Sequence, residues 1–318
     1  MTDLPVRIEI TEEGPREGFQ IEKGPIATAD KIALIDALSA AHPPRMQIVS
    51  FVSPKLVPGW ADAEAVAAGF TPRPGIAYTA LWFNAQGLSR ALAFRDRLSI
   101  TGSITFAASE AFSRKNLNRG HAEQMAAQRA LIATCRSAGV PVERIALQAA
   151  FGCNYAGDVE VAQAMAVLED AMALAAEEGC AITKVTLADT MGWADPLHIE
   201  RLVGAVRERW PNLAVALHLH DTRGLGIANA LAGLRMGVAM FDAAVGGLGG
   251  CPFAGQPGAP GNIATEELVF LAHEMGIETG IDLDALLEAA ALAERIVGRR
   301  LPSNLLHGGS LTRFRKAA

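Results

Sequence analysis

The chain has few cysteines, no long apolar run and no concentration of positive charge. Its four cysteines (Cys135, Cys153, Cys180 and Cys251) are too few and too scattered for a disulfide framework or a zinc ribbon, so we expect a reducing, cytoplasmic compartment. The longest apolar-rich stretches, 161–176 and 283–293, carry charges at helical spacing, which argues against a membrane span. The first residues lack the basic and apolar regions of a signal peptide.

The charge balance also argues against a nucleic-acid partner. The formal net charge is −6, and no basic stripe interleaved with aromatic residues is present. Half of the 318 residues are hydrophobic and only 19% are charged, so the chain can bury a large core. We therefore expect a globular protein with a large core and no nucleic-acid partner.

Short apolar runs alternate with amphipathic segments along the chain. Strands are expected near residues 6–12, 46–51, 76–82, 99–106, 143–149, 182–188, 213–219 and 240–245. Helices are expected near residues 28–41, 61–68, 85–95, 117–138, 157–178, 195–209, 225–236 and 262–275, with an additional one near 282–298. Eight strand–helix pairs predict a (β/α)8 TIM barrel with a C-terminal helical extension. Residues 1–300 are expected to form a single catalytic domain, followed by a mobile tail over 301–318.

Two histidines stand one residue apart where an apolar segment, 213–217, ends. Side chains alternate faces along a strand, so His218 and His220 would point the same way, about 6.5–7 Å apart along the chain. Two imidazoles at the end of a strand can hold a divalent metal. A hydrogen-bonded core pair or a solvent-facing pair is an equally good interpretation of this motif on its own.

Polar groups also follow other predicted strands, and in a barrel these loops share one mouth. Arg16 and Glu17 follow the first strand in a constrained turn, although an exposed surface pair is the commoner fate of such residues. Asp189 follows the sixth strand, either as a helix N-cap or as a group lining the mouth. Glu17 and Asn262 could add oxygen ligands to the two imidazoles, a mixture that suits Mg²⁺ or Mn²⁺.

Several motifs together resemble the hydroxymethylglutaryl-CoA lyase family, a group of metal-dependent TIM-barrel acyl-CoA lyases. The resemblance runs from about Val6 to about Ala293. The motifs that carry it are GPREG at 14–18, SFVSPK at 50–55, Asp189-Thr190, HLHDT at 218–222, GGLGGCPFA at 246–254 and GNIATE at 261–266.

The resemblance implies cleavage of a carbon–carbon bond in a branched 3-hydroxyacyl-CoA, with 3-hydroxy-3-methylglutaryl-CoA as the leading substrate and acetyl-CoA and acetoacetate as products. It implies that the metal ligands are Glu17, His218, His220 and Asn262. Arg16 would neutralise the enolate oxygen, Asp189 would handle a proton or position a group, and Cys251 would protonate the released carbanion. His218 would thus belong to the catalytic set together with Arg16, Asp189 and Cys251.

Two further residues are assigned to coenzyme A by the same resemblance. Lys23 follows the first motif and could contact coenzyme A or the loop that closes over it. Asn116 lies in the basic segment 113–119, which could contact coenzyme A phosphates or could simply be a solvated helix start. A homo-oligomer, most simply a dimer, is expected from the family and the extra C-terminal helix.

The chain departs from the family pattern at some positions. Glu17 stands where aspartate is usual, and Gln47 stands where the family has a glutamate. These changes could compensate for one another or mark a related substrate, such as a citramalyl-, methylmalyl- or isohexenylglutaryl-CoA type thioester. Arg223 replaces a usual tyrosine and could bind a second carboxylate or cap a surface. A Claisen-condensing acyltransferase and a non-catalytic barrel that binds a CoA ester remain as alternatives.

Overall fold

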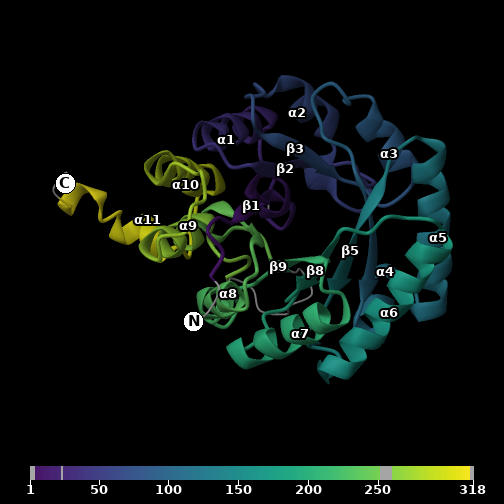
Figure 1. Ribbon diagram of the computed structural model, residues 1–318. Helices are drawn as coiled ribbons and strands as arrows, with labels where there is room; N and C mark the ends of the chain where they lie inside the picture. Colours follow the sequence, from purple (N-terminus) through teal and green to yellow (C-terminus); the bar gives the residue numbers. More distant parts are fainter. Residues whose placement is uncertain (1–3, 23, 251–259, 316–318) are drawn as a thin grey trace.

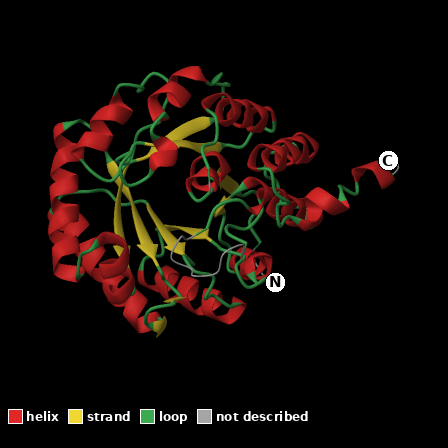
Figure 2. Ribbon diagram, turned by 180° about the vertical axis from the view of Figure 1, so that it is seen from behind, coloured by secondary structure: helices red, strands yellow, loops and turns green. Residues whose placement is uncertain are grey.

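The computed structural model describes residues 4–22, 24–250 and 260–315, and its centre is a sheet of eight parallel strands. The order β3-β2-β1-β10-β9-β8-β5-β4 curls this sheet into a barrel with helices outside it, which confirms the predicted TIM barrel (Figures 1 and 2). The strands are β1 (Glu9–Glu12), β2 (Arg45–Ser50), β3 (Ala77–Leu81), β4 (Gly102–Ala107), β5 (Val142–Gln148), β8 (Lys184–Ala188), β9 (Ala214–His218) and β10 (Met240–Ala243).

Helices connect the strands and cover the outside of the sheet (Figure 2). They are α1 (Thr28–Ala40), α2 (Ala63–Gly69), α3 (Ala85–Leu92), α4 (Glu110–Leu117), α5 (His121–Ser137), α6 (Val161–Glu177), α7 (Pro196–Arg209), α8 (Gly226–Arg235), α9 (Thr265–Glu274), α10 (Leu283–Val297) and α11 (Asn304–Gly308). Short elements are the π-helical turn η1 (Gly14–Gly18), the 3-10 turns η2 (Pro58–Trp60), η3 (Val245–Gly247) and η4 (Thr312–Phe314), and the hairpin of β6 (Gly152–Cys153) and β7 (Gly157–Asp158).

Side-chain caps and apolar faces explain why these segments form helices. The Asn84 side chain accepts a hydrogen bond from the backbone N–H of Gly87 at the start of α3, and Asp195 accepts one from His198 at the start of α7. Helix α1 buries Leu34, Ile35 and Leu38 on the face that packs inward. These contacts fix the helices around the sheet and so fix the loops at its carboxyl edge.

Two sequence-based boundaries differ from the structure. The single helix expected over 117–138 is two helices, α4 and α5, because Asn118 adopts a left-handed conformation with φ 53° and ends α4. The helix expected from residue 157 begins at Val161, after the short strand β7. At the C-terminus, Leu301 and Ser303 are buried and α11 follows them, within the segment expected to be mobile.

No helix in the described ranges is long and apolar enough to cross a membrane. Cys135, Cys153 and Cys180 are free thiols, and Cys251 lies outside the described residues.

Candidate metal centre and active site

The two histidines converge at the end of β9. The Nε2 atoms of His218 and His220 lie 3.1 Å apart, and His220 is 4% exposed. Two ligands at about 2.1 Å from one Mg²⁺ ion and at right angles to each other would be about 3.0 Å apart. The spacing therefore fits adjacent positions in an octahedral shell.

Glu17, on the turn η1, supplies a carboxylate to the same point. Its Oε1 atom lies 3.9 Å from His218 Nε2 and 3.6 Å from His220 Nε2. These three residues form a group whose ligand atoms lie within 4.8 Å of one another. The combination of two imidazoles and one carboxylate gives this chain a candidate metal site.

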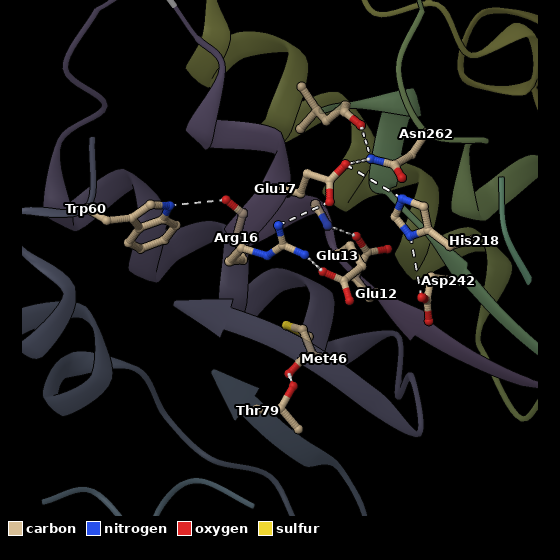
Figure 3. A network of polar contacts seen from close by, with 12 residues as sticks. Glu12, Glu13, Arg16, Glu17, Met46, Trp60, Thr79, His218, Asp242 and Asn262 are labelled. Carbon is tan, nitrogen blue, oxygen red and sulfur yellow. Dashed lines mark hydrogen bonds and ion pairs between the residues drawn. The ribbon is translucent and has the colours of Figure 1, made fainter. Parts of the chain in front are cut away.

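Asn262 adjoins this group, and Figure 3 shows its amide facing Glu17. Its Nδ2 donates hydrogen bonds to Glu17 Oε1 at 2.9 Å and to the backbone oxygen of Leu248 at 3.0 Å. Its Oδ1 is buried and has no hydrogen-bond partner among the described residues. A buried amide oxygen without a partner is costly, so it fits a role as a metal or substrate contact.

The glycine-rich segment approaches these residues closely. A Cβ atom at Gly249, which has φ +85°, would lie 2.6 Å from Asn262 Nδ2 and 3.0 Å from Glu17 Cγ. No larger side chain fits there without displacing the site. A glycine-rich segment does not by itself indicate a ligand site. Here the contact explains why position 249 is a glycine.

Asp242 supports His218 from the neighbouring strand β10. Its Oδ2 atom lies 3.4 Å from His218 Nδ1. Burial lowers the pKa of His218, but the hydrogen bond to Asp242 and the negative charge of Glu17 outweigh it and raise the pKa to about 9. Burial likewise raises the pKa of Glu17, but Arg16 and the histidines hold it well below its usual value. The metal-free site is thus an ionised cluster of carboxylates around a cationic histidine.

Arg16 lies beside the metal group, buried at 9% exposure. Its Nη1 is 3.1 Å from Glu17 Oε2, and its Nη2 donates to Glu13 Oε2 (Figure 3). Its backbone oxygen accepts a hydrogen bond from Trp60 Nε1 at 3.2 Å. The third guanidinium nitrogen, Nε, is buried without a partner among the described residues.

Glu13, like Asp242, is a site residue that the sequence analysis missed. It is buried at 3% exposure and follows β1 directly. The available signal was a carboxylate at the end of an apolar strand, the same signal that singled out Asp189. In the sequence Glu13 resembles part of a charged surface turn, which is why its burial was not expected.

Asp189, at the end of β8, is almost fully buried. Its Oδ1 accepts a hydrogen bond from the backbone N–H of Trp193 at 2.6 Å, and its Oδ2 accepts one from Ala194 at 3.1 Å. Burial raises its pKa above the usual value despite these bonds. Arg223 holds the same turn, because its Nη1 donates to the backbone oxygens of Met191 at 2.8 Å and Gly192 at 2.9 Å.

The structure brings six sequence-predicted residues to the carboxyl edge of the sheet: Arg16, Glu17, Asp189, His218, His220 and Asn262. Asn116 lies on α4 and is half-buried. Gln47, on β2, is buried with its Oε1 unpartnered among the described residues. Lys23 and Cys251, expected to contact coenzyme A and to donate a proton, lie outside the described residues.

Comparison with known proteins identifies the family of this chain. The family model described as HMGL-like matches residues 7–293. Hydroxymethylglutaryl-CoA lyase of Bacillus subtilis is 39% identical over 303 residues, which cover 95% of this chain and 97% of that protein. The mitochondrial hydroxymethylglutaryl-CoA lyase of Rattus norvegicus is 40% identical over 306 residues, covering 96% and 90% of the two chains.

A solved structure of an HMG-CoA lyase from Acinetobacter baumannii, in complex with coenzyme A and 3-methylmalate, is also similar. It matches with a TM-score of 0.86 and 35% identity, covering 100% of both chains. The match therefore extends over the whole barrel and its C-terminal extension. The chain belongs to the HMGL-like family, as its motifs predicted.

Proposed function

We propose that this protein is a metal-dependent carbon–carbon lyase that cleaves 3-hydroxy-3-methylglutaryl-CoA to acetyl-CoA and acetoacetate. The observation that carries the proposal is the convergence of His218, His220 and Glu17 beside the buried guanidinium of Arg16. Relatives named for this reaction share about two fifths of their residues with the chain over almost its full length.

The donor set supports Mg²⁺ or Mn²⁺ as the metal. We propose that His218 and His220 bind it through Nε2, that Glu17 binds it through a carboxylate oxygen, and that Asn262 adds its amide oxygen. Nitrogen and oxygen donors without a thiolate suit these ions in an octahedral shell. When bound, a divalent cation lowers the pKa of the substrate hydroxyl and fixes its orientation.

The reaction needs a base, a cation and an acid. The C3 hydroxyl loses its proton, the C2–C3 bond breaks, and the electron pair of that bond passes to C2 and the thioester oxygen. Asp189 is the proposed base, since burial raises its pKa and two backbone N–H groups hold its carboxylate in place. Arg16 is the proposed cation at the enolate oxygen, and its unpartnered Nε is an available donor.

The remaining roles rest on the family resemblance. We propose that Cys251 protonates C2 of the departing acetyl-CoA, and that Lys23 and Asn116 contact coenzyme A. We also propose a cytoplasmic homodimer, which light scattering of the purified protein would test. A mass matching one chain would contradict the dimer without affecting the lyase assignment.

A related thioester is the second candidate, and one observation favours it. Gln47 places a neutral amide with an unpartnered buried oxygen on β2, where the family pattern has a carboxylate. This change alters the charge that faces a substrate. Citramalyl-, methylmalyl- and isohexenylglutaryl-CoA thioesters are therefore included in the test.

The test is a substrate panel with metal-stripped protein, with and without added Mg²⁺ or Mn²⁺. We expect acetoacetate from 3-hydroxy-3-methylglutaryl-CoA only when a cation is present. Cleavage of another thioester without cleavage of 3-hydroxy-3-methylglutaryl-CoA would contradict the proposed substrate and support the proposed reaction class. No cleavage of any thioester would contradict the lyase proposal.

A further inference from the structure

Glu13 is a buried carboxylate to which the proposed reaction gives no role. It lies directly after β1, and its backbone N–H donates to the oxygen of Ala243 on β10 at 2.8 Å. Its own backbone oxygen accepts from the N–H of Glu17 at 2.8 Å. The residue is thus fixed at the start of the turn η1 that carries Arg16 and Glu17.

The side chain of Glu13 points into the barrel mouth. Parallel pairing sets Glu12 level with Met46 on β2, and Glu13 and Gln47 are the next residues along the two segments. Both residues are buried. Figure 3 shows the carboxylate of Glu13 between the guanidinium of Arg16 and the side chain of Asp242. A carboxylate therefore occupies this part of the mouth even though position 47 is an amide.

Such a carboxylate is stable only with a partner, because removing a charge from water costs several kcal/mol. Burial raises the pKa of Glu13, and the opposing charge of Arg16 lowers it. The ion pair to Nη2 of Arg16 is the partner that the structure provides. Loss of that ion pair would leave an uncompensated buried charge.

Arg16 forms ion pairs with two carboxylates, Glu17 and Glu13, which differ in their other contacts. Glu17 forms an ion pair with Arg16, accepts a hydrogen bond from Asn262 and also faces both histidines. Among the residues that the structure describes, the side chain of Glu13 forms its hydrogen bond and ion pair with Arg16 alone. The guanidinium thus has one anchor that belongs to the metal group and one that is independent of it.

We infer that Glu13 is a positioning residue, which holds the guanidinium of Arg16 at the place where negative charge develops during bond cleavage. This inference rests on the proposed lyase function. A guanidinium anchored at one end only would rotate about Nε and miss the developing oxyanion for part of the time. A displacement of about 1 Å at such a group can lower a rate by about 10²-fold.

The kinetic test is E13Q, which keeps the size of the side chain and removes its charge. We expect kcat to fall by about 10²-fold, with KM within about threefold of the wild type and with unchanged affinity for Mn²⁺. The matched control is E9Q, at the first residue of β1, which removes a carboxylate that lies 3.3 Å from Nε of Arg45. A normal kcat in E13Q, or an equal loss in E9Q, would overturn the inference.

The second measurement does not depend on turnover. In protein with ¹⁵N-labelled arginine, the Nη signals of Arg16, identified by their loss in R16K, should show slow rotation of the guanidinium. In E13Q that rotation should become about as fast as in exposed arginines. Rapid rotation in the wild type, or unchanged rotation in E13Q, would contradict the inference even if E13Q is unstable. Slow rotation in a wild type that cleaves no thioester would support the positioning role and refute the lyase function.

Discussion

The Nδ1 atom of His218 lies 3.4 Å from Oδ2 of Asp242, which is its direct neighbour in the pairing of β9 with β10. With Nδ1 facing this carboxylate, Nε2 faces Glu17 and His220, and its lone pair becomes available to a cation once the ring gives up its Nε2 proton. A carboxylate behind a metal-binding imidazole fixes the tautomer and makes the ring a better ligand. Asp242 is therefore expected to control how His218 binds a cation.

The variant D242N tests this relationship. An amide accepts the same hydrogen bond without the charge, so we expect affinity for Mn²⁺ to fall by about 10- to 100-fold, with the fold retained. Calorimetric titration of metal-stripped protein measures the change. Affinity equal to that of the wild type would remove Asp242 from the site.

Loss of one imidazole should remove most of the metal affinity. H220Q leaves His218, Glu17 and Asn262 in place but removes the imidazole whose Nε2 lies 3.1 Å from His218 Nε2 and 3.6 Å from Glu17 Oε1. We expect no saturable binding of Mn²⁺ at concentrations that saturate the wild type, measured by electron paramagnetic resonance of the free ion. H121Q is the control, since His121 pairs with Asp170 on the outer helices. Wild-type binding in H220Q would refute the candidate site.

Arg16 should be essential for turnover but not for metal binding. In R16Q the buried cation beside the candidate metal site is lost, whereas the three residues of that site remain. We expect kcat/KM to fall by about 10³-fold, as when an oxyanion-stabilising donor is removed, with Mn²⁺ still bound. R129Q, in an exposed ion pair on α5, is the matched control. Near-normal rates in R16Q would exclude Arg16 from the mechanism.

Glu12 should make the protein less stable as the pH rises. Burial raises the pKa of its carboxyl to about 8, although Oε1 accepts from the backbone of Gly14 and Val245 and Oε2 accepts from Thr265. Between the unfolded value of 4.5 and about 8, the folded protein holds a proton that the unfolded chain has released. The free energy of unfolding therefore falls by up to about 1.4 kcal/mol per pH unit in this range.

Urea unfolding of the metal-free protein measures this slope. The range from pH 4.5 to 6.5 is the most informative, because His218 does not contribute to the slope there. Its pKa rises from 6.5 to about 9 on folding, so below pH 6.5 the ring is protonated in both the folded and the unfolded state. E12Q should show a flatter dependence than the wild type. Parallel curves would mean that Glu12 is ionised in the folded protein.

The barrel and the convergence of the two histidines could be predicted because each depends on a local pattern. Apolar runs of strand length and the alternation of His218 and His220 are properties of short segments. The break between α4 and α5 was missed because it depends on the backbone of Asn118. The burial of Glu13 was missed because its ion pair with Arg16 forms only once β1, β2 and β10 are assembled. Long-range packing decides whether a charged turn is solvated or buried.

Glu17 is longer than the aspartate usual at this position, and E17D tests what the extra methylene does. In this chain one oxygen of Glu17 accepts from Asn262 Nδ2 at 2.9 Å while the other lies 3.1 Å from Arg16 Nη1. Shortening the side chain withdraws the carboxylate by about 1.5 Å from histidine nitrogens that are already 3.6 and 3.9 Å away.

We expect Mn²⁺ to bind E17D about tenfold more weakly and the pKa of His218 to fall, because the carboxylate of Glu17 helps to raise that pKa. Proton resonances of the imidazole and metal titration report the two effects, with E22D, which changes an exposed ion pair with Arg299, as the control. Tighter metal binding in E17D would show that the turn η1 relaxes to bring the shorter carboxylate to the metal site. The longer side chain of Glu17 would then be required for the substrate and not for the metal.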